Sequence, residues 1–161
     1  MQSNSLYDTL IIDTPIGKMI ATADEKAITT LDFTDETLES TPSENPLLMR
    51  LEEELYEYFE GKREIFTLPL SPIGTLFQKE VWQILCTIPY GETVSYAAEA
   101  KLCGNPKAIR AVANANGRNP ISILIPCHRV IATGGGIGGY SGGIEKKKFL
   151  LELEKKKIKQ A

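Results

Sequence analysis

The stretch ILIPCHRVIATGGGIGGYSGG (residues 123–143) contains the only histidine of the chain, His128, directly after a cysteine, Cys127. Arg129 follows, and the proline before the cysteine restricts the local backbone. Positive or proton-accepting neighbours favour the thiolate, which is the nucleophilic form of cysteine. Cys127 is therefore the candidate nucleophile. In an extended segment, adjacent side chains point to opposite sides, so a bridging water is easier than direct contact between Cys127 and His128.

Other interpretations of these residues stay open at this stage. A free cysteine is often only a small buried apolar residue, and this interpretation is preferred for Cys86 and Cys103, which lie in apolar helical patterns. A Cys–His pair also serves cysteine hydrolases. The glycines Gly134, Gly136 and Gly139 match a dinucleotide-binding pattern, but a helix is expected where the second strand and its acidic residue are needed. We therefore reject a dinucleotide site.

The first part of the chain predicts a small antiparallel sheet with one helix. Residues 6–33 hold three short runs with β-branched residues, separated by turn residues. A helix is expected between the cap Asn45 and Gly61, with leucines on one face and glutamates, Glu54 among them, on the others. The proline-broken segment 64–73 is interpreted as a final strand and a connector.

The second part predicts mainly helices. A possible capping box, Thr75–Gln78, opens a helix that runs through Cys86, with Phe77 among its core residues. Two short helices follow at 95–103 and 106–116. The tight glycine-containing turn between them is typical of a helix-turn-helix.

A last helix is expected over residues 145–159, with Phe149, Leu150, Leu153 and Ile158 inward. The predicted fold class is α/β, of the α+β type. It combines a small N-terminal antiparallel-sheet lobe, residues 1–70, with a helical C-terminal lobe, residues 71–161, that contains the helix-turn-helix.

Charge divides the two lobes. Residues 1–70 hold 15 acidic and 5 basic side chains, a balance of -10, while residues 71–161 hold 6 acidic and 13 basic, a balance of +7, which together give -3. The second lobe is therefore expected to attract polyanions. Its second short helix has small side chains and the cations Lys107, Arg110 and Arg118, which suits docking on a DNA backbone. The alternative is that the small residues only pack against neighbouring helices.

Composition indicates which compartment, membrane association and metal binding to expect. No apolar run of about 18 residues and no secretory signal are present, so no membrane partner is expected. Three cysteines cannot all pair, which favours a reducing, intracellular compartment, and we expect a cytoplasmic location. With one histidine and no C-x-x-C, the chain lacks ligands for a structural zinc site.

Four blocks of the sequence resemble a known family. PCHRVI (residues 126–131) is similar to the active-site signature of the O6-alkylguanine-DNA alkyltransferases, also called methylated-DNA–protein-cysteine methyltransferases. The other blocks match in order and spacing: GTLFQKEVWQILCTIPYGETVSY (74–96), GNPKAIRAVANANGRNP (104–120) and GGYSGGIEKKKFLLELE (138–154). The first lobe resembles the family's variable, ribonuclease-H-like N-terminal domain only loosely.

The resemblance implies DNA repair by direct, irreversible, single-turnover transfer. The methyl group of O6-methylguanine, and more weakly of O4-methylthymine, would move to the protein's own cysteine. Cys127 would accept it, His128 would act through a water, and Glu154 would orient the histidine. Tyr96 would turn the nucleotide's phosphate outward and is a candidate donor to the leaving guanine, while Arg110 would fill the gap in the base stack.

The remaining implied roles concern binding. Lys107 and Arg118 join Arg110 and Tyr96 at the DNA, while Asn119, Tyr140 and Ser141 support or line the pocket. At Ala98 the sequence departs from many members, which carry an acid that caps the helix. The expected partner is double-stranded DNA with alkylated guanine, bound by a monomer without cofactor or metal. The alternative functions are a non-catalytic alkyl-lesion-binding protein and a cysteine hydrolase.

Overall fold

The computed structural model describes residues 7–39 and 42–160, except for the side chains of residues 157–160. The chain forms two compact units, Met1–Pro72 and Ile73–Ala161. Within the described residues, no helix is both long and apolar enough to cross a membrane.

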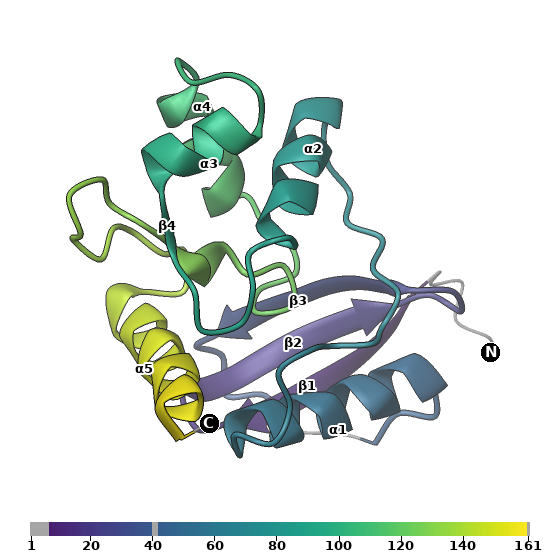
Figure 1. Ribbon diagram of the computed structural model, residues 1–161. Helices are drawn as coiled ribbons and strands as arrows, with labels where there is room; N and C mark the ends of the chain where they lie inside the picture. The colour runs from purple at the N-terminus through teal and green to yellow at the C-terminus, as the bar shows by residue number, and fades with distance from the viewer. Residues whose placement is uncertain (1–6, 40–41, 161) are drawn as a thin grey trace. The chain divides into compact units, whose positions relative to one another are not determined.

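The first unit contains a three-stranded antiparallel sheet in the order β1-β2-β3 (Figure 1). The strands are β1 Asp8–Thr14, β2 Gly17–Ala23 and β3 Ile28–Thr34, which confirms the predicted sheet. Alternate residues of β2 are buried, as expected where one face of a strand packs on a core. Leu6, where the first strand was expected to begin, lies outside the described residues.

Helix α1, Pro46–Phe59, lies along one face of this sheet (Figure 1). The side chain of Asn45 accepts hydrogen bonds from the backbone N–H groups of Leu47 and Leu48, so the predicted cap is confirmed. Gly61 follows the helix with φ of 75°, the left-handed conformation that commonly ends helices. The leucine face is buried, which supplies the core of this unit.

Two expectations for the first unit were wrong. Glu54 is buried instead of solvated, because its carboxylate accepts a hydrogen bond from the Thr67 backbone N–H at 2.9 Å and lies 3.5 Å from Arg50 Nε. The segment 64–73 forms no strand but a single bridge between Ile28 and Leu70. Pro69 and Pro72, on either side of Leu70 and Ser71, donate no backbone hydrogen bond, which prevents a longer ladder.

In the second unit, helix α2 is Leu76–Leu85, and both halves of the predicted Thr75–Gln78 capping box are present. The indole Nε1 of Trp82 donates to the carbonyl of Ala115 at 2.9 Å, which ties α2 to helix α4. Phe77 was expected in the core, but 38% of its surface is exposed. Trp82 and the adjacent Val81 are buried in the core instead.

The two predicted short helices are α3, Tyr96–Leu102, and α4, Ile109–Gly117. Gly104, with φ of 80°, follows α3 as predicted. Helix α4 begins three residues later than Pro106, because Asn105 forms a turn with Ala108 before the helix starts. Between these helices and α2 lies an apolar core, made by Val81, Ala100, Val112 and Ala115.

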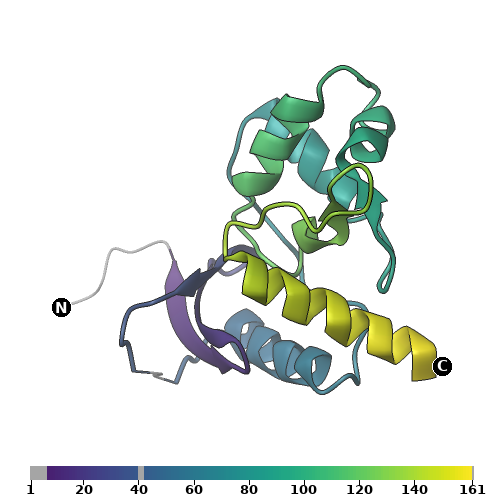
Figure 2. The ribbon, with the colours of Figure 1, turned by 90° about the vertical axis from the view of Figure 1, so that its left-hand side faces the viewer.

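The rest of the second unit carries the cysteine. A single 3-10 turn, η1 Cys127–Arg129, leads into β5 Val130–Ile131, which pairs in parallel with β4 Val94–Ser95. Helix α5, Ile144–Gln160, ends the unit. In two perpendicular views, α2, α3 and α4 gather together and η1 lies between them and α5 (Figures 1 and 2).

Of the four side chains expected to point inward from α5, one is fully buried and one is exposed. Leu150 is fully buried, as predicted, whereas Phe149 keeps 38% of its surface exposed. Leu153 is half-buried, and the Ile158 side chain lies outside the described residues.

Candidate active site

A small cavity of about 190 Å³ reaches Cys127. It is lined by residues from α3, α4, η1 and the loop before α5: Tyr96, Ala113, Asn116, Gly117, Cys127, Gly139, Tyr140 and Ser141. Four predicted site residues, far apart in the sequence, thus meet around one space. The volume lies below the ~300–1,000 Å³ typical of sites for drug-sized ligands, so the cavity suits a group about the size of one base.

The Cys127 thiol belongs to a buried segment. Residues 121–130 are all buried, and Cys127 is 7% exposed. Asn119 Nδ2 donates to Cys127 Sγ at 3.2 Å and to the carbonyl of Ile125 at 2.7 Å, while its Oδ1 accepts from the Ile121 N–H. One amide therefore positions both the sulfur and the backbone that carries it.

Burial raises the pKa of the Cys127 thiol to about 11, against the hydrogen bond from Asn119 and the charge of Lys147. The expectation that neighbours favour the thiolate was therefore wrong for this state, in which the sulfur carries its proton. The other expectation on cysteines is reversed as well: Cys86 is exposed and Cys103 half-buried, while Cys127 is the buried one.

Behind the cysteine lies a buried triad of charged and polar side chains. His128 Nε2 is 2.7 Å from Glu154 Oε2, and Arg129 Nε donates to Glu154 Oε1 at 2.8 Å. A second guanidinium nitrogen of Arg129 donates to the carbonyl of Ile88. Burial alone would raise the pKa of Glu154, but hydrogen bonds and charge from His128 and Arg129 outweigh it and lower that pKa to about 2. Glu154 is thus ionised.

The triad determines which histidine nitrogen is free to react. Burial lowers the pKa of His128, so the ring is neutral at neutral pH. The carboxylate of Glu154 accepts a hydrogen bond from Nε2–H, which leaves a lone pair on Nδ1. Within the described part of the chain, Nδ1 is buried and has no hydrogen-bond partner. It is therefore available as a proton acceptor.

Lys147, the middle residue of a run of three lysines, is fully buried. Its Nζ donates to the carbonyls of Val130 at 2.6 Å and Gly139 at 2.9 Å, and lies 5.9 Å from the centre of the Tyr96 ring. It joins β5, the glycine loop and the cavity wall. Its positive charge favours the thiolate of Cys127, in opposition to burial.

Tyr96 forms part of the wall of the cavity. Burial raises the pKa of its phenol, so the group keeps its proton at neutral pH. The loop approaches it closely: a Cβ added at Gly138, where φ is 75°, would lie 3.0 Å from two atoms of Tyr96. A glycine is therefore required here by both backbone and space.

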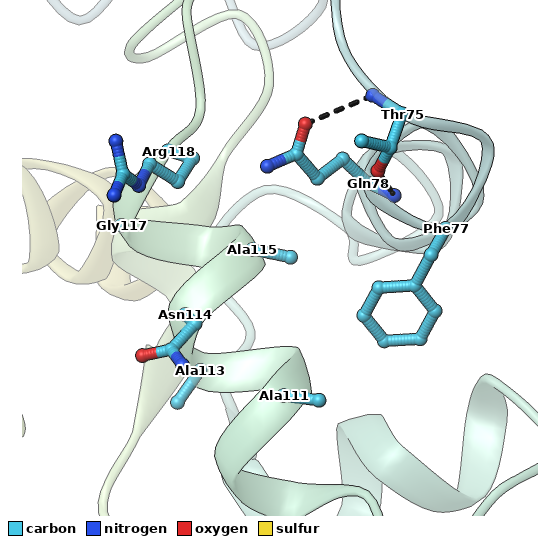
Figure 3. A pocket seen from close by; sticks show the side chains of 9 residues that line it. All are labelled: Thr75, Phe77, Gln78, Ala111, Ala113, Asn114, Ala115, Gly117 and Arg118. Atoms are coloured by element: carbon cyan, nitrogen blue, oxygen red, sulfur yellow. Dashed lines mark hydrogen bonds between the residues drawn. The ribbon is translucent and has the colours of Figure 1, made fainter.

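A second, wider groove of about 540 Å³ lies on the other side of α4 (Figure 3). In Figure 3 the methyl groups of Ala111 and Ala115 face Phe77 and Gln78 of α2. Ala113 and Gly117 line both the groove and the cavity. Because small residues separate the two spaces, a ligand lying in the groove would lie next to the cavity.

The predicted site residues divide into four groups. Tyr96, Cys127, Tyr140 and Ser141 line the cavity; Asn119, His128 and Glu154 lie in the hydrogen-bonded shell behind it. Arg118 lines the groove. Lys107 and Arg110 are exposed and line neither space.

Lys147, Arg129, Glu99 and Asn116 were missed as site residues. A signal existed for the lysine: positions 147, 150 and 154 are three and four residues apart, so they share one face of a helix. With Leu150 and Glu154 assigned inward, Lys147 follows.

Comparisons with known proteins cover nearly the whole chain. The model of the DNA-binding domain of the 6-O-methylguanine DNA methyltransferases matches residues 76–156, and that of the ribonuclease-like domain matches residues 6–72. A methylated-DNA–protein-cysteine methyltransferase from Methanosarcina barkeri is 46% identical over 158 residues, 95% of this chain and 99% of its own.

Two solved structures agree with this result. The Mycobacterium tuberculosis O6-methylguanine methyltransferase is similar with a TM-score of 0.84 and 42% identity, over 94% of both chains. The structure of Mycobacterium tuberculosis OGT in complex with DNA is similar with a TM-score of 0.83 and 43% identity, over 91% of this chain and 92% of that one.

Proposed function

Because this chain belongs to the 6-O-methylguanine DNA methyltransferase family, we propose that Cys127 takes the alkyl group from O6-methylguanine in duplex DNA. The reaction class, alkyl transfer from DNA to a cysteine of the protein itself, follows from membership. The observation that carries the assignment to Cys127 is its position: a buried sulfur at a base-sized cavity, held by Asn119 and followed by a histidine with a free nitrogen.

The proposed chemistry balances within the site. His128 Nδ1 takes the thiol proton through one water, and the ionised Glu154 stabilises the resulting imidazolium. The sulfur then attacks the methyl carbon, so an S–C bond forms as the C–O bond to guanine breaks. Tyr96, whose phenol stays protonated, donates a hydrogen bond to the leaving guanine anion, and the proton that His128 took from the thiol passes through water to the freed base. Among the described residues of the site, no group is placed to cleave the product thioether, so each molecule is proposed to react once.

A base in a duplex cannot reach this cavity, so the lesion must leave the stack. We propose that α3 and α4 act as a helix-turn-helix and that α4, with its small residues, lies against the DNA. Lys107, Arg110 and Arg118 would contact phosphates or fill the vacated stack, and the groove in Figure 3 would hold the strand beside the flipped nucleotide. Residues 71–161 would thus carry binding and transfer, with residues 1–70 a supporting ribonuclease-like lobe.

The test is a mass measurement. Purified protein is mixed with a duplex oligonucleotide that carries one O6-methylguanine, and its peptides are weighed. One added methyl group on the Cys127 peptide is expected, with no turnover beyond one per protein. Cys127→Ala should bind the same duplex and gain no methyl group; a methyl group elsewhere in the chain would contradict the assignment.

Arg110→Ala should slow transfer from duplex DNA by about tenfold or more, because base extrusion costs a few kcal/mol and the arginine is proposed to offset it. Transfer from free O6-methylguanine base should hardly change, since no extrusion is needed. Single-turnover rates on the two substrates provide the measurement. Equal losses on both would remove Arg110 from this role.

We also expect O4-methylthymine to react more slowly than O6-methylguanine. Binding to DNA should weaken steeply with salt, because phosphate contacts release counterions. We further propose that the protein acts as a monomer. A cytoplasmic location is consistent with the three free cysteines. A lesion-binding protein without transfer would gain no methyl group, so the mass of the wild-type Cys127 peptide separates the two functions.

A further inference from the structure

A buried polar pair lies behind the wall of the cavity, between α3 and α4. Asn116 of α4 lines the cavity, and its Nδ2 donates to Glu99 Oε1 of α3 at 2.7 Å. Glu99 is fully buried and Asn116 is 7% exposed. This hydrogen bond crosses between the two helices proposed to bind DNA.

If Glu99 is ionised, the pair lacks hydrogen-bond donors for two of its oxygens. Glu99 Oε2 and Asn116 Oδ1 are both buried and lack a hydrogen-bond donor among the residues that the structure describes. Two oxygen acceptors without a donor are costly in a buried site, and a buried carboxylate without a cation is costlier still. One proton on Oε2 removes the charge and turns that oxygen into a donor.

The groups around Glu99 do not favour its charge. Among the described residues, Glu99 affects the pKa values of Tyr96 and Cys103, at the two ends of α3, and of Cys127 in η1, and no cation is among the causes that shift its own pKa. Burial raises the pKa of Glu99 to about 7, although the hydrogen bond from Asn116 opposes the shift. A negative charge on Glu99 would in turn raise the pKa values of Cys127 and Tyr96.

We propose that Glu99 is a positioning residue that works as a neutral acid, holding the Asn116 wall of the cavity and keeping negative charge away from the Cys127 sulfur. This inference rests on the proposed function, because it assumes that Cys127 is the acceptor. When Glu99 ionises, the pair loses its donor and formation of the thiolate becomes harder. Where Glu99 keeps its proton, the wild type should therefore transfer as fast as a variant that cannot ionise. At higher pH, where Glu99 ionises, the wild type should be slower than that variant.

The test uses Glu99→Gln, which keeps an acceptor and a donor but cannot ionise. Single-turnover transfer is measured at about pH 6 and about pH 8.5, on either side of a pKa near 7. The variant should match the wild type within about twofold at the lower pH and exceed it several-fold at the higher pH. The exposed Glu92→Gln is the matched control and should show no such change in ratio.

A second readout needs no DNA. The folded-state pKa of Glu99 lies above its unfolded value, so its stabilising effect is full below about pH 4.5 and is lost as pH rises to about 7. Urea midpoints of the wild type should fall over this window relative to Glu99→Gln. The proposal would be overturned if the urea midpoints of the wild type and Glu99→Gln changed in parallel with pH. It would also be overturned if Glu99→Gln lost the same fraction of the transfer rate at both pH values. Absence of any transfer in the wild type would reject the proposed function, while the midpoints would still test Glu99.

Discussion

Glu154→Gln is expected to slow single-turnover alkyl transfer by about 10²-fold or more, the usual contribution of a positioned base. The carboxylate of Glu154 accepts a hydrogen bond from Nε2–H of His128, so Nδ1 carries the free lone pair. A neutral amide cannot stabilise the imidazolium that forms when the ring takes the thiol proton. The rate is measured on a duplex that carries O6-methylguanine, and the folded fraction is checked by circular dichroism.

The same substitution should destabilise the protein, because it leaves the guanidinium of Arg129 buried without its anion, a loss of about 3–5 kcal/mol. The pKa of Glu154 is lowered to about 2 in the folded protein, so its stabilising effect is present above pH 4.5 and is lost as pH falls toward 2. Glu154→Gln should therefore lack this part of the acid unfolding transition.

Two variants separate catalysis from stability. Arg129→Met removes the same ion pair but keeps the contact between His128 and Glu154, so it should lower stability while losing less of the rate. Glu152→Gln, two residues earlier on the exposed face of α5, should change neither. A folded Glu154→Gln protein that transfers at the rate of the wild type would exclude Glu154 from the reaction.

Local signals in the sequence were sufficient for much of the fold. The Asn45 cap and the Thr75–Gln78 capping box predicted the starts of α1 and α2, because these bonds join residues two or three positions apart. The start of α4 was placed too early, since the turn between Asn105 and Ala108 competes with the helix. Family and reaction class, stated from four sequence blocks, are confirmed by the comparisons.

The site could be predicted only where chemistry shows in a residue's type. Cys127 and His128 stand out in the sequence, but the acidity of the thiol does not: Arg129, its charged neighbour along the chain, turns to Glu154 and to the carbonyl of Ile88. Burial is then the largest effect on the pKa of the Cys127 thiol, and it raises that pKa. Glu99 was equally invisible, because its burial depends on packing between α3 and α4.

Lys147→Met is expected to slow transfer at neutral pH by about tenfold, which corresponds to a rise of one pKa unit at the Cys127 thiol. Lys147 is the cation whose charge favours the thiolate in the described site. Without it the thiol pKa rises, so the limb of the rate profile that increases with pH should move to higher pH. Ultraviolet absorbance of the thiolate during a pH titration measures the shift directly.

The substitution also removes the donor to the carbonyls of Val130 and Gly139, and leaving buried carbonyls unpaired costs about 1–3 kcal/mol each. Lys147→Arg keeps the charge and should hold the thiol pKa near that of the wild type, even where its larger head group lowers stability. Lys148→Met on the exposed side of α5 is the matched control. If Lys147→Met and Lys147→Arg lose rate equally with an unchanged thiol pKa, Lys147 acts through the loop alone and its charge has no part in the reaction.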